Sequence, residues 1–252
     1  MATTIAISGK GGSGKTTLAA MIIRILSSQS HGAILAVDAD PNACLAPMIG
    51  VEPAASIADV REKVVENTPT NSGMDRVRSF EYGIQQAITE ANGFDLLTMG
   101  RPEGPGCYCA ANNMLRIFMD KLSPQYQYVI IDNEAGMEHL SRRTTNNVDL
   151  LCIVAEPTAI GALTARRISE LAKQLPISVK EIGVIWNRTN SSKKLDEIDT
   201  LGCIPDDKSI FDASMQGQTV FDLEENSAAL SAVRKILESK LNRSFQLTKN
   251  QN

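Results

Sequence analysis

The sequence predicts a single α/β domain over residues 1–252, with a mainly parallel β-sheet covered by helices on both faces. Two observations carry this prediction. Short apolar runs alternate with longer segments of helical spacing, which favours βαβ units. A glycine-rich segment, Gly9–Thr16, joins the first apolar run to the first helical segment. No linker rich in proline, serine or glycine divides the chain, so one domain is expected.

Six apolar runs are expected to form the strands of this sheet. Most of them are continuously apolar, as strands covered on both faces are. They are Thr4–Ser8, Ile34–Val37, Leu96–Met99, Tyr128–Asp132, Leu150–Ala155 and Ile182–Trp186. The segments of helical spacing between and after them are Gly14–Ser27, Ala111–Leu122, Gly161–Gln174 and Asn226–Leu241.

Two regions do not follow this alternation. Residues 51–93 are polar and carry no clear strand signal, so they are expected to form a helical excursion. The tail Asn242–Asn252 is polar and is expected to fray.

The composition excludes several classes of protein. With 43% apolar and 21% charged residues, it is that of an ordinary soluble globular chain. A net charge of −4 argues against bulk binding of nucleic acid. The N-terminal residues lack the pattern of a secretory signal, and no long apolar window favours stable membrane insertion. An odd count of five cysteines fits a reducing cytoplasm rather than a disulfide scaffold.

The glycine-rich segment matches the phosphate-binding pattern G-x-x-x-x-G-K-[ST] of the P-loop NTPase fold. Its residues are Gly9, Lys10, Gly11, Gly12, Ser13, Gly14, Lys15 and Thr16, and Thr17 extends the set of nucleotide-binding candidates. Glycines let backbone N–H groups surround phosphates, and the following helix adds its dipole. Lys15 would reach the β- and γ-phosphates, and the Thr16 hydroxyl would bind Mg²⁺. The pattern therefore predicts binding of ATP or ADP with Mg²⁺.

Lys10 adds a second prediction, because an ordinary phosphate loop does not require lysine at this position. The pattern resembles the deviant Walker A motif of MinD, ArsA and nitrogenase iron-protein type ATPases. The resemblance implies a homodimer in which Lys10 crosses to the partner's nucleotide and offsets charge on its phosphates during hydrolysis. The alternative interpretation is a solvated surface lysine.

Acidic residues follow two of the expected strands, at the sheet edge where ligands of parallel sheets bind. Asp38 and Asp40 follow Ile34–Val37, and Asp132 ends Tyr128–Asp132. The resemblance implies that Asp40 activates the attacking water and that Asp132 holds Mg²⁺, through a water molecule. Asp38 is a candidate helper, and turn or helix-cap roles are the alternative for both Asp38 and Asp40. Gly136 resembles the residue that reports the γ-phosphate.

The base pocket is predicted from a late strand. Asn187 and Arg188 follow Ile182–Trp186, and Asn187 resembles the asparagine that reads a purine edge in these families. Pro205 resembles part of the loop that covers the base. The alternative for Asn187 is a simple loop residue.

Cys107 and Cys109 form a C-x-C pair inside a segment rich in glycine and proline. One chain offers two thiolates there, whereas a closed thiolate metal site needs about four. A symmetric dimer would duplicate the pair and so complete the site. Two free thiols and a redox pair are the alternatives, although a redox pair usually reads C-x-x-C.

Residues 99–109 and 132–140, together with the deviant Walker A motif, resemble the CooC/AcsF family of nickel-insertion ATPases. The resemblance covers most of the chain, to about Pro205. It implies that ATP drives dimer closure and that Cys107 and Cys109 of both subunits bind Ni²⁺ or Zn²⁺. It also implies a client, carbon monoxide dehydrogenase or acetyl-CoA synthase, without deciding between them. Of the other cysteines, Cys44 is expected to be a small buried hydrophobe, with sensing of the nucleotide state as the alternative, whereas Cys152 is expected to lie in the core and Cys203 to be structural.

Three alternatives remain. A MinD- or ParA-like positioning ATPase would use the C-terminal stripe Leu230, Val233, Leu237 and Leu241 at a membrane surface, whereas packing of this stripe on the sheet is the simpler expectation. An iron–sulfur electron-transfer ATPase would bridge its dimer with cysteines that lie far apart in sequence. A nucleotide-gated binding module would show negligible turnover.

Overall fold

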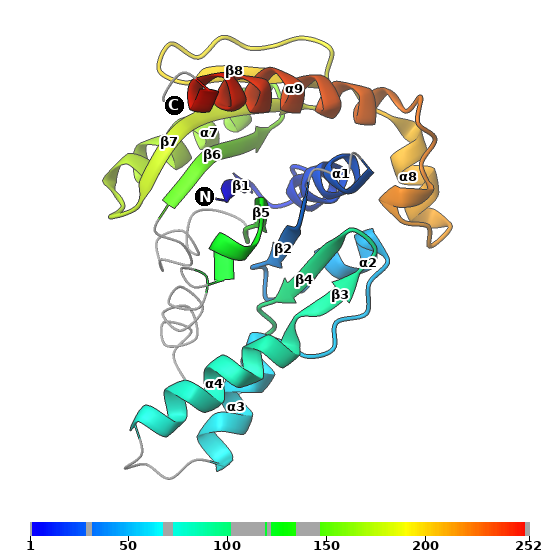
Figure 1. Ribbon diagram of the computed structural model, residues 1–252. Helices are drawn as coiled ribbons and strands as arrows, with labels where there is room; N and C mark the ends of the chain where they lie inside the picture. The colour runs from blue at the N-terminus through cyan, green and yellow to red at the C-terminus, as the bar shows by residue number, and fades with distance from the viewer. Residues whose placement is uncertain are drawn as a thin grey trace.

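The computed structural model describes residues 2–28, 32–67, 73–101, 119, 122–134 and 147–249. Eight strands form one sheet in the order β3-β4-β2-β5-β1-β6-β7-β8 (Figure 1). They are β1 (Thr3–Gly9), β2 (Ile34–Asp38), β3 (Thr89–Ala91), β4 (Phe94–Thr98), β5 (Tyr128–Asp132), β6 (Asn147–Ala155), β7 (Ser178–Asn187) and β8 (Asp199–Ile204). All neighbouring strands are parallel except β3 and β4, which form an antiparallel hairpin. The predicted mainly parallel α/β fold is confirmed.

All six predicted strands are present, but the sequence analysis missed two more. The strand β3 lies at one edge of the sheet. In the sequence it belongs to residues 51–93, which were predicted to be helical and to lack strands. The strand β8 lies at the other edge and mixes apolar with polar residues and glycine. Edge strands are covered less completely than central ones, so they need no continuous apolar run.

The helices are α1 (Lys15–Ser28), α2 (Leu45–Ile49), α3 (Ile57–Asn67), α4 (Gly73–Ala87), α7 (Ala159–Gln174), α8 (Lys208–Met215) and α9 (Ala228–Lys249), with 3₁₀ turns η1 (Ser123–Gln125) and η2 (Val220–Asp222). The helical excursion is confirmed as α3 and α4. The predicted helix Asn226–Leu241 is present as α9, which extends to Lys249. The predicted helix Ala111–Leu122 lies largely outside the described residues.

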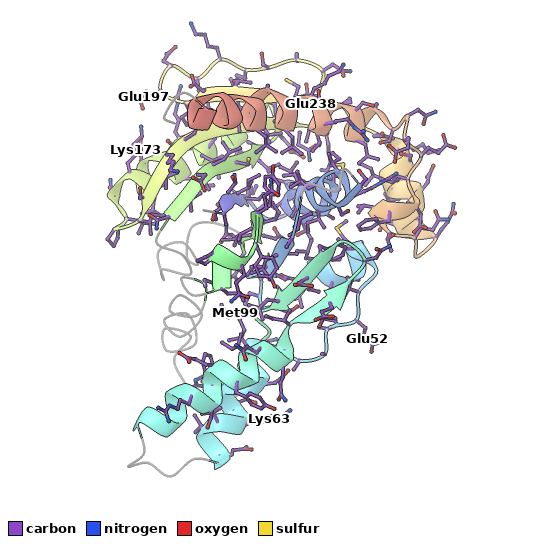
Figure 2. The ribbon with its side chains drawn as sticks, viewed as in Figure 1. Glu52, Lys63, Met99, Lys173, Glu197 and Glu238 are labelled. Atoms are coloured by element: carbon purple, nitrogen blue, oxygen red, sulfur yellow. The ribbon has the colours of Figure 1, made fainter. Side chains whose placement is uncertain are left out.

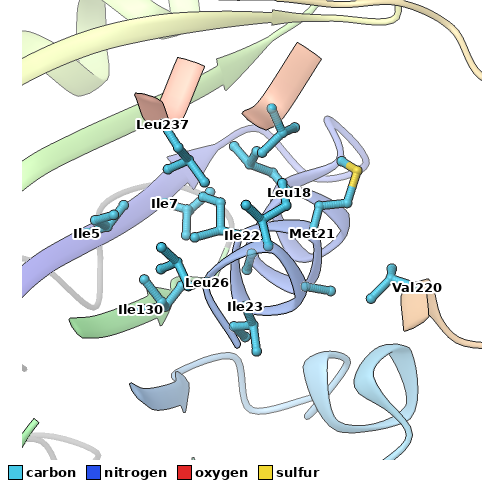
Figure 3. Close-up of a cluster of buried hydrophobic side chains, with 14 of the residues drawn as sticks. Ile5, Ile7, Leu18, Met21, Ile22, Ile23, Leu26, Ile130, Val220 and Leu237 are labelled. Atoms are coloured by element: carbon cyan, nitrogen blue, oxygen red, sulfur yellow. The ribbon is translucent and has the colours of Figure 1, made fainter. Parts of the chain in front are cut away.

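Two hydrophobic clusters form on opposite faces of the sheet because strand side chains alternate in direction. In β1, Ile5 and Ile7 point to the cluster formed with α1, α2 and α9, and Figure 3 shows them facing side chains of α1. Ala6, between them, belongs to the opposite cluster, formed with α3, α4 and α7. The sheet therefore carries helices on both faces, as predicted.

The α3–α4 pair extends from the sheet near β4 (Figure 1). Its inner face packs Val60 and Val64 with Phe80 and Ile84. Figure 2 shows Met99 where this pair meets the sheet. There the Ala58 amide donates to the Met99 carbonyl oxygen at 3.0 Å, which fixes the start of α3 to the end of β4.

The apolar stripe of α9 faces the core rather than solvent. Leu230, Val233 and Leu237 are each at most 4% exposed, and Leu241 packs against the same cluster. Leu237 points toward Ile7 of β1 (Figure 3). The packed interpretation of the stripe is therefore confirmed for residues 230–241.

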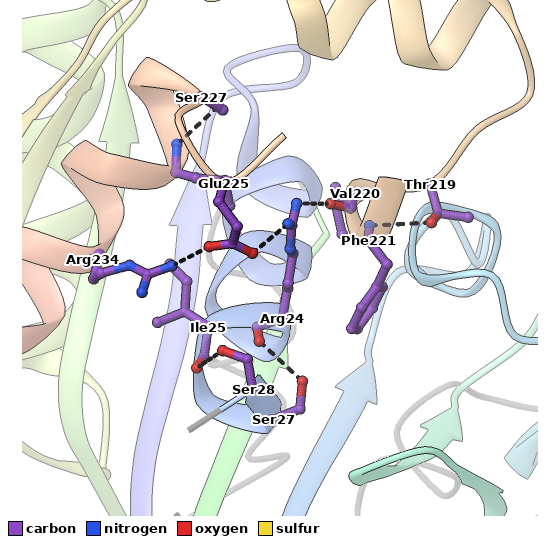
Figure 4. A network of polar contacts seen from close by, with 11 residues as sticks. Arg24, Ile25, Ser27, Ser28, Thr219, Val220, Phe221, Glu225, Ser227 and Arg234 are labelled. Atoms are coloured by element: carbon purple, nitrogen blue, oxygen red, sulfur yellow. Dashed lines mark hydrogen bonds and ion pairs between the residues drawn. The ribbon is translucent and has the colours of Figure 1, made fainter. Parts of the chain in front are cut away.

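A polar network fixes the segment before α9 to α1 (Figure 4). Arg24 of α1 donates to the Val220 carbonyl oxygen at 2.6 Å and to the Glu225 carboxylate at 2.7 Å. Arg234 of α9 donates to the other oxygen of Glu225 at 2.9 Å. Because the Arg24 side chain is 9% exposed, its charge needs these acceptors.

None of the helices in the described part of the chain combines the length and apolar character needed to cross a lipid bilayer.

Leu230→Ala should lower the free energy of unfolding by about 2–5 kcal/mol, because Leu230 is 1% exposed and its loss leaves a cavity between α9 and α1. The matched control is Leu163→Ala, since Leu163 is 47% exposed and should change stability by less than about 0.5 kcal/mol. Urea denaturation followed by circular dichroism measures both. Equal, small effects would show that α9 does not belong to the core.

Candidate nucleotide-binding site

The register of the sheet brings the predicted acidic residues together at one edge. Asp38 ends β2 and pairs with Asp132, which ends β5. Asp132 in turn pairs with Ile7 of β1, two residues before the phosphate loop begins at Gly9. Parallel strands end at the same edge, so carboxylates that are far apart in sequence lie beside the loop.

The phosphate loop adopts a conformation that depends on glycine. Gly9, Gly12 and Gly14 have φ values of 156°, 75° and 95°. A Cβ atom on Gly9 would lie 2.4 Å from the Val154 carbonyl oxygen of the neighbouring β6, so only glycine fits there. The Ser13 amide donates to the Lys10 carbonyl oxygen at 3.2 Å and closes the loop.

The two lysines of the loop have different surroundings. Lys15 begins α1, is 7% exposed, and its Nζ lies 3.4 Å from the Lys10 carbonyl oxygen. Its ammonium group therefore folds back over the loop, where phosphates would bind. Lys10 is exposed, and it lines a hollow of about 280 Å³ with Gly11, Glu156, Thr158, Ile160 and Gly161, among others. Among the described residues, the Lys10 side chain therefore lies at the surface.

Asp132 is fully buried, and both of its carboxylate oxygens lack a hydrogen-bond partner among the described residues. Burial raises the pKa of this carboxyl from 3.8 to about 7, and the nearby Asp38 and Asp40 carboxylates add to the rise. The Thr16 hydroxyl and Lys15 oppose it. A buried carboxylate with a hydroxyl next to it is a donor set that suits Mg²⁺, so Thr16 and Asp132 fit the predicted metal.

Asp38 and Asp40 hold the loop that follows β2. The oxygens of Asp38 accept hydrogen bonds from the amides of Leu45, at 2.9 Å, and Asp40, at 3.2 Å. Burial raises the pKa of Asp38 to about 6, although these amides lower it in part. Asp40 is half-buried, and one of its oxygens accepts both the backbone and side-chain N–H groups of Asn42. Asp38 therefore serves as an anchor for the loop, and the hydrogen bonds that Asp40 accepts from Asn42 leave its second oxygen without a donor among the described residues.

The expectation that Cys44 is buried is wrong. Cys44 is exposed at the start of α2, directly after this loop. Partial desolvation of the thiol and the charges of Asp40, Asp38 and Asp132 raise the pKa of Cys44. Cys152 is buried in β6 as expected, and Cys203 is half-buried in β8.

Asn187 ends β7 and binds the phosphate loop directly. Its Nδ2 donates to the Ser13 carbonyl oxygen at 2.8 Å, and its Oδ1 accepts the Arg188 amide at 3.0 Å. A Cβ atom on Gly14 would lie 2.3 Å from Nδ2, so glycine makes this contact possible. Arg188 has a left-handed φ of 56° and forms an ion pair of 3.0 Å with Glu156. Asn187 therefore positions the loop, a role that the sequence analysis did not assign.

A pocket of about 470 Å³ lies beside the loop, a volume suited to a ligand the size of a nucleotide. The pocket is lined by the three predicted base-pocket residues, Asn187, Arg188 and Pro205, and by Gly14 and Thr17 of the loop. The sequence analysis did not identify the other side of the pocket, which α2 and α8 supply through Met48, Ile210, Phe211 and Ser214. Apolar residues on helices carry no signal that separates a pocket wall from a core face.

Asn133 is a further residue that the sequence analysis missed. It is 1% exposed, and its Nδ2 donates to the Ile7 carbonyl oxygen at 2.9 Å, which fixes the end of β5 to β1. A polar residue directly after an apolar strand was the available signal. Cys107, Cys109 and Gly136 lie outside the described residues.

Comparison with known proteins gives three kinds of match. A family model described as the CobQ/CobB/MinD/ParA nucleotide binding domain matches residues 4–220. An uncharacterized ATP-binding protein of Methanocaldococcus jannaschii is 39% identical, over 96% of this chain and 99% of that protein. The carbon monoxide dehydrogenase accessory protein CooC of Rhodospirillum rubrum is 36% identical, over 87% of this chain and 89% of that protein.

Solved structures share the fold at lower identity. The cell division ATPase MinD of Pyrococcus furiosus has a TM-score of 0.69 and 20% identity, and the match covers 96% of this chain and 99% of that one. MinD of Pyrococcus horikoshii, complexed with Mg-ADP, has a TM-score of 0.68 and 20% identity, over 95% and 96% of the two chains. The predicted P-loop NTPase fold is therefore confirmed.

Asp132→Asn should stabilise the nucleotide-free protein at pH 8 by about 1–3 kcal/mol. The folded-state pKa is raised from 3.8 to about 7, so the folded state holds the proton more tightly than the unfolded chain. The free energy of unfolding of the wild type therefore falls as pH rises from about 4 to about 7. Asparagine keeps the shape without the charge, so the difference between the proteins should shrink as pH falls toward 4.

Urea denaturation in chelator-containing buffer between pH 4 and pH 8 measures this difference. Asp199→Asn, at an exposed position of β8, is the control and should leave stability nearly unchanged at every pH. An Asp132→Asn protein less stable than the wild type at pH 8 would contradict the assignment of a buried, electrostatically costly carboxylate.

Proposed function

The chain belongs to the CobQ/CobB/MinD/ParA family of nucleotide-binding domains, and we propose that it is a dimeric metallochaperone driven by ATP. As a MinD/ParA-type ATPase it hydrolyses ATP to ADP and phosphate. In the proposed function it carries nickel at paired C-x-C segments. It assists insertion of nickel into carbon monoxide dehydrogenase or acetyl-CoA synthase.

The likeness to the carbon monoxide dehydrogenase accessory protein of Rhodospirillum rubrum carries this proposal. At 36% identity the match extends over 87% of this chain and 89% of that protein, so it is not confined to the phosphate loop. The Cys107-x-Cys109 pair supports the proposal independently, because soft thiolates select metals such as nickel and zinc.

In the proposed hydrolysis the chain's own residues position the phosphates and the water. Backbone N–H groups of residues 9–16 and the Lys15 ammonium hold the β- and γ-phosphates. Mg²⁺, bound by Thr16 and by Asp132, would neutralise charge on the phosphate oxygens. The second oxygen of Asp40 would accept a hydrogen bond from the attacking water, and Asn187 and Asp38 keep the loops around it in place.

The proposed dimer would form across the exposed face around Lys10. Ile160 and Leu163 at the start of α7 are 64% and 47% exposed, which is unusual for large apolar side chains. Ile160 lines the same hollow as Lys10. A two-fold axis beside this face would bring Lys10 to the partner's nucleotide and cover the apolar side chains.

Nickel is the cargo in this proposal. Each subunit contributes Cys107 and Cys109, so a dimer offers four thiolates, enough for a closed site. Because closure around ATP and assembly of this site involve the same two subunits, hydrolysis would reopen the dimer and release the metal.

A MinD-like positioning ATPase is the second candidate, favoured by the fold it shares with MinD of Pyrococcus furiosus. Such a function would require a surface that meets the membrane. The apolar stripe of α9 does not supply one over residues 230–241, because it packs in the core. Sedimentation with anionic liposomes that depends on ATP would favour this candidate over the metallochaperone.

The wild-type protein should bind about one Ni²⁺ per two chains, and Cys107→Ala/Cys109→Ala should bind none, because only four thiolates close the site. Equilibrium dialysis with metal analysis, with and without ATP, measures the stoichiometry. Cys44→Ala is the matched control, since Cys44 is an exposed thiol outside the pair. Wild-type stoichiometry in the double variant would refute the site, and a stable iron–sulfur chromophore would favour an electron-transfer ATPase.

Lys10→Ala should keep nucleotide binding but lose ATP-dependent dimerisation and lower the hydrolysis rate on the order of 10³-fold, because a charge supplied by the partner would be missing. Analytical ultracentrifugation and phosphate release measure the two effects. Lys193→Ala, at an exposed position, is the control. A fully active, monomeric Lys10→Ala protein would rule out the role of Lys10 across the dimer.

A further inference from the structure

The loop between β2 and α2 carries Asp40, the residue proposed to hold the attacking water, and both ends of this loop are fixed. At its start the Ala39 amide donates to the Asp132 carbonyl oxygen at 2.9 Å, which joins the loop to the end of β5. At its end Leu45 is fully buried and belongs to the core. Residues 40–44, between these points, are exposed or half-buried. The orientation of Asp40 therefore depends on contacts within a short surface segment.

The polar groups of Asp40 are almost all engaged inside this segment. Its amide donates to the Asp38 carboxylate at 3.2 Å, and its carbonyl oxygen accepts the Ala43 amide at 2.9 Å. One carboxylate oxygen accepts two hydrogen bonds from Asn42, one from the backbone N–H and one from Nδ2, both at 2.9 Å. Among the described residues, the other carboxylate oxygen has no donor. The carboxylate is thus held through one oxygen only.

The backbone turn that brings Asn42 to Asp40 ends in a strained residue. Ala43 has a φ of 50°, in the left-handed region that residues with a side chain rarely adopt. Such a backbone costs free energy and persists where its surroundings hold it, as the hydrogen bond from the Ala43 amide to Asp40 does here. Pro41 restricts the backbone of the same turn further. The turn therefore holds Asn42 against the Asp40 carboxylate.

We infer that Asn42 is a positioning residue for ATP hydrolysis: its side-chain N–H group orients the Asp40 carboxylate so that the second oxygen meets the attacking water. The role rests on the proposed function of Asp40. A water molecule must be aligned with the phosphate that it attacks, so a misplaced carboxylate lowers the rate of the chemical step. Asn42 lines neither the pocket nor the hollow beside the phosphate loop, so it should not contribute to ATP binding.

A turn residue without this role would give a different result. If Asn42 only kept the loop folded, its loss would loosen the nucleotide site, and ATP would bind more weakly as turnover fell. A positioning residue instead lowers the turnover number at saturating ATP and leaves the dissociation constant of ATP unchanged. Because Asn42 is exposed, its replacement removes no core packing.

The first variant is Asn42→Ala, which removes the Nδ2 donor and keeps the backbone N–H. Its turnover number should fall roughly 5- to 50-fold, with ATP affinity within about 2-fold of the wild type. Phosphate release at saturating ATP with Mg²⁺, and calorimetric titration with a non-hydrolysable ATP analogue, measure the two quantities. The matched control is Asn190→Ala, since Asn190 is also exposed but lies in another loop. ATP-dependent dimerisation should be retained, which separates this defect from that of Lys10→Ala.

Two variants of Ala43 test the same geometry without changing the Asn42 side chain. Ala43→Gly is the conservative variant, because glycine adopts the left-handed turn readily, and it should retain turnover. Ala43→Val disfavours the turn, because a β-branched residue rarely adopts a positive φ. Its turnover number should fall as in Asn42→Ala, again with ATP affinity kept.

Wild-type turnover in both Asn42→Ala and Ala43→Val would overturn the positioning role and leave the proposed function intact. A loss of ATP affinity as large as the loss of turnover would also overturn it, because the loop would then only shape the nucleotide site. If the wild type bound the analogue but released no phosphate from ATP, with nickel present, the proposed ATPase function would fail, and the role of Asn42 would fail with it.

Discussion

The burial of the Asp132 carboxylate beside the Thr16 hydroxyl is the constraint on which the functional edge of the sheet depends. Folding places it between β1 and β2, with Asp38 and Asp40 nearby, and the cost appears as a pKa raised to about 7. A buried carboxylate destabilises the folded protein when the site is empty, whereas it binds a divalent cation favourably when one is present.

The surrounding contacts keep this edge in register. Three main-chain hydrogen bonds of 2.8 to 3.2 Å join these strand ends. The backbone amides of Asn133, Ala39 and Met99 donate to the carbonyl oxygens of Ile7, Asp132 and Asp38, respectively. The ends of four strands, β4, β2, β5 and β1, are thereby joined through main-chain groups, which do not depend on side-chain identity. Asn187 adds a side-chain contact from β7 to the loop. The phosphate loop is consequently held from both sides by rigid elements, as a site that must discriminate small changes in charge requires.

The central strands could be predicted from the sequence because they are buried on both faces. The run Tyr128–Asp132 was predicted with the bounds that the structure has, since all five residues are buried. The strands β3 and β8 could not be predicted, because strands at the edge of a sheet need no continuous apolar run. The phosphate loop was predictable because its chemistry constrains consecutive residues. The pocket positions of Phe211 and Met48 were not predictable, since only tertiary packing brings α2 and α8 to the loop. Cys44 was misjudged for a related reason: the fold of a loop, not residue type, decided its exposure.

The packing of α9 on α1 also has a consequence for the order of folding. Leu230, Val233 and Leu237 belong to the same cluster as Ile5, Ile7 and the apolar side chains of α1, so the last helix of the chain packs on the first. Contacts that join such distant segments are slow to form, because a long loop must close first. During synthesis the side of α1 that packs against α9 therefore stays exposed until α9 has left the ribosome. Chains that end before α9 should therefore aggregate through the exposed side of α1, whereas their central sheet should still assemble.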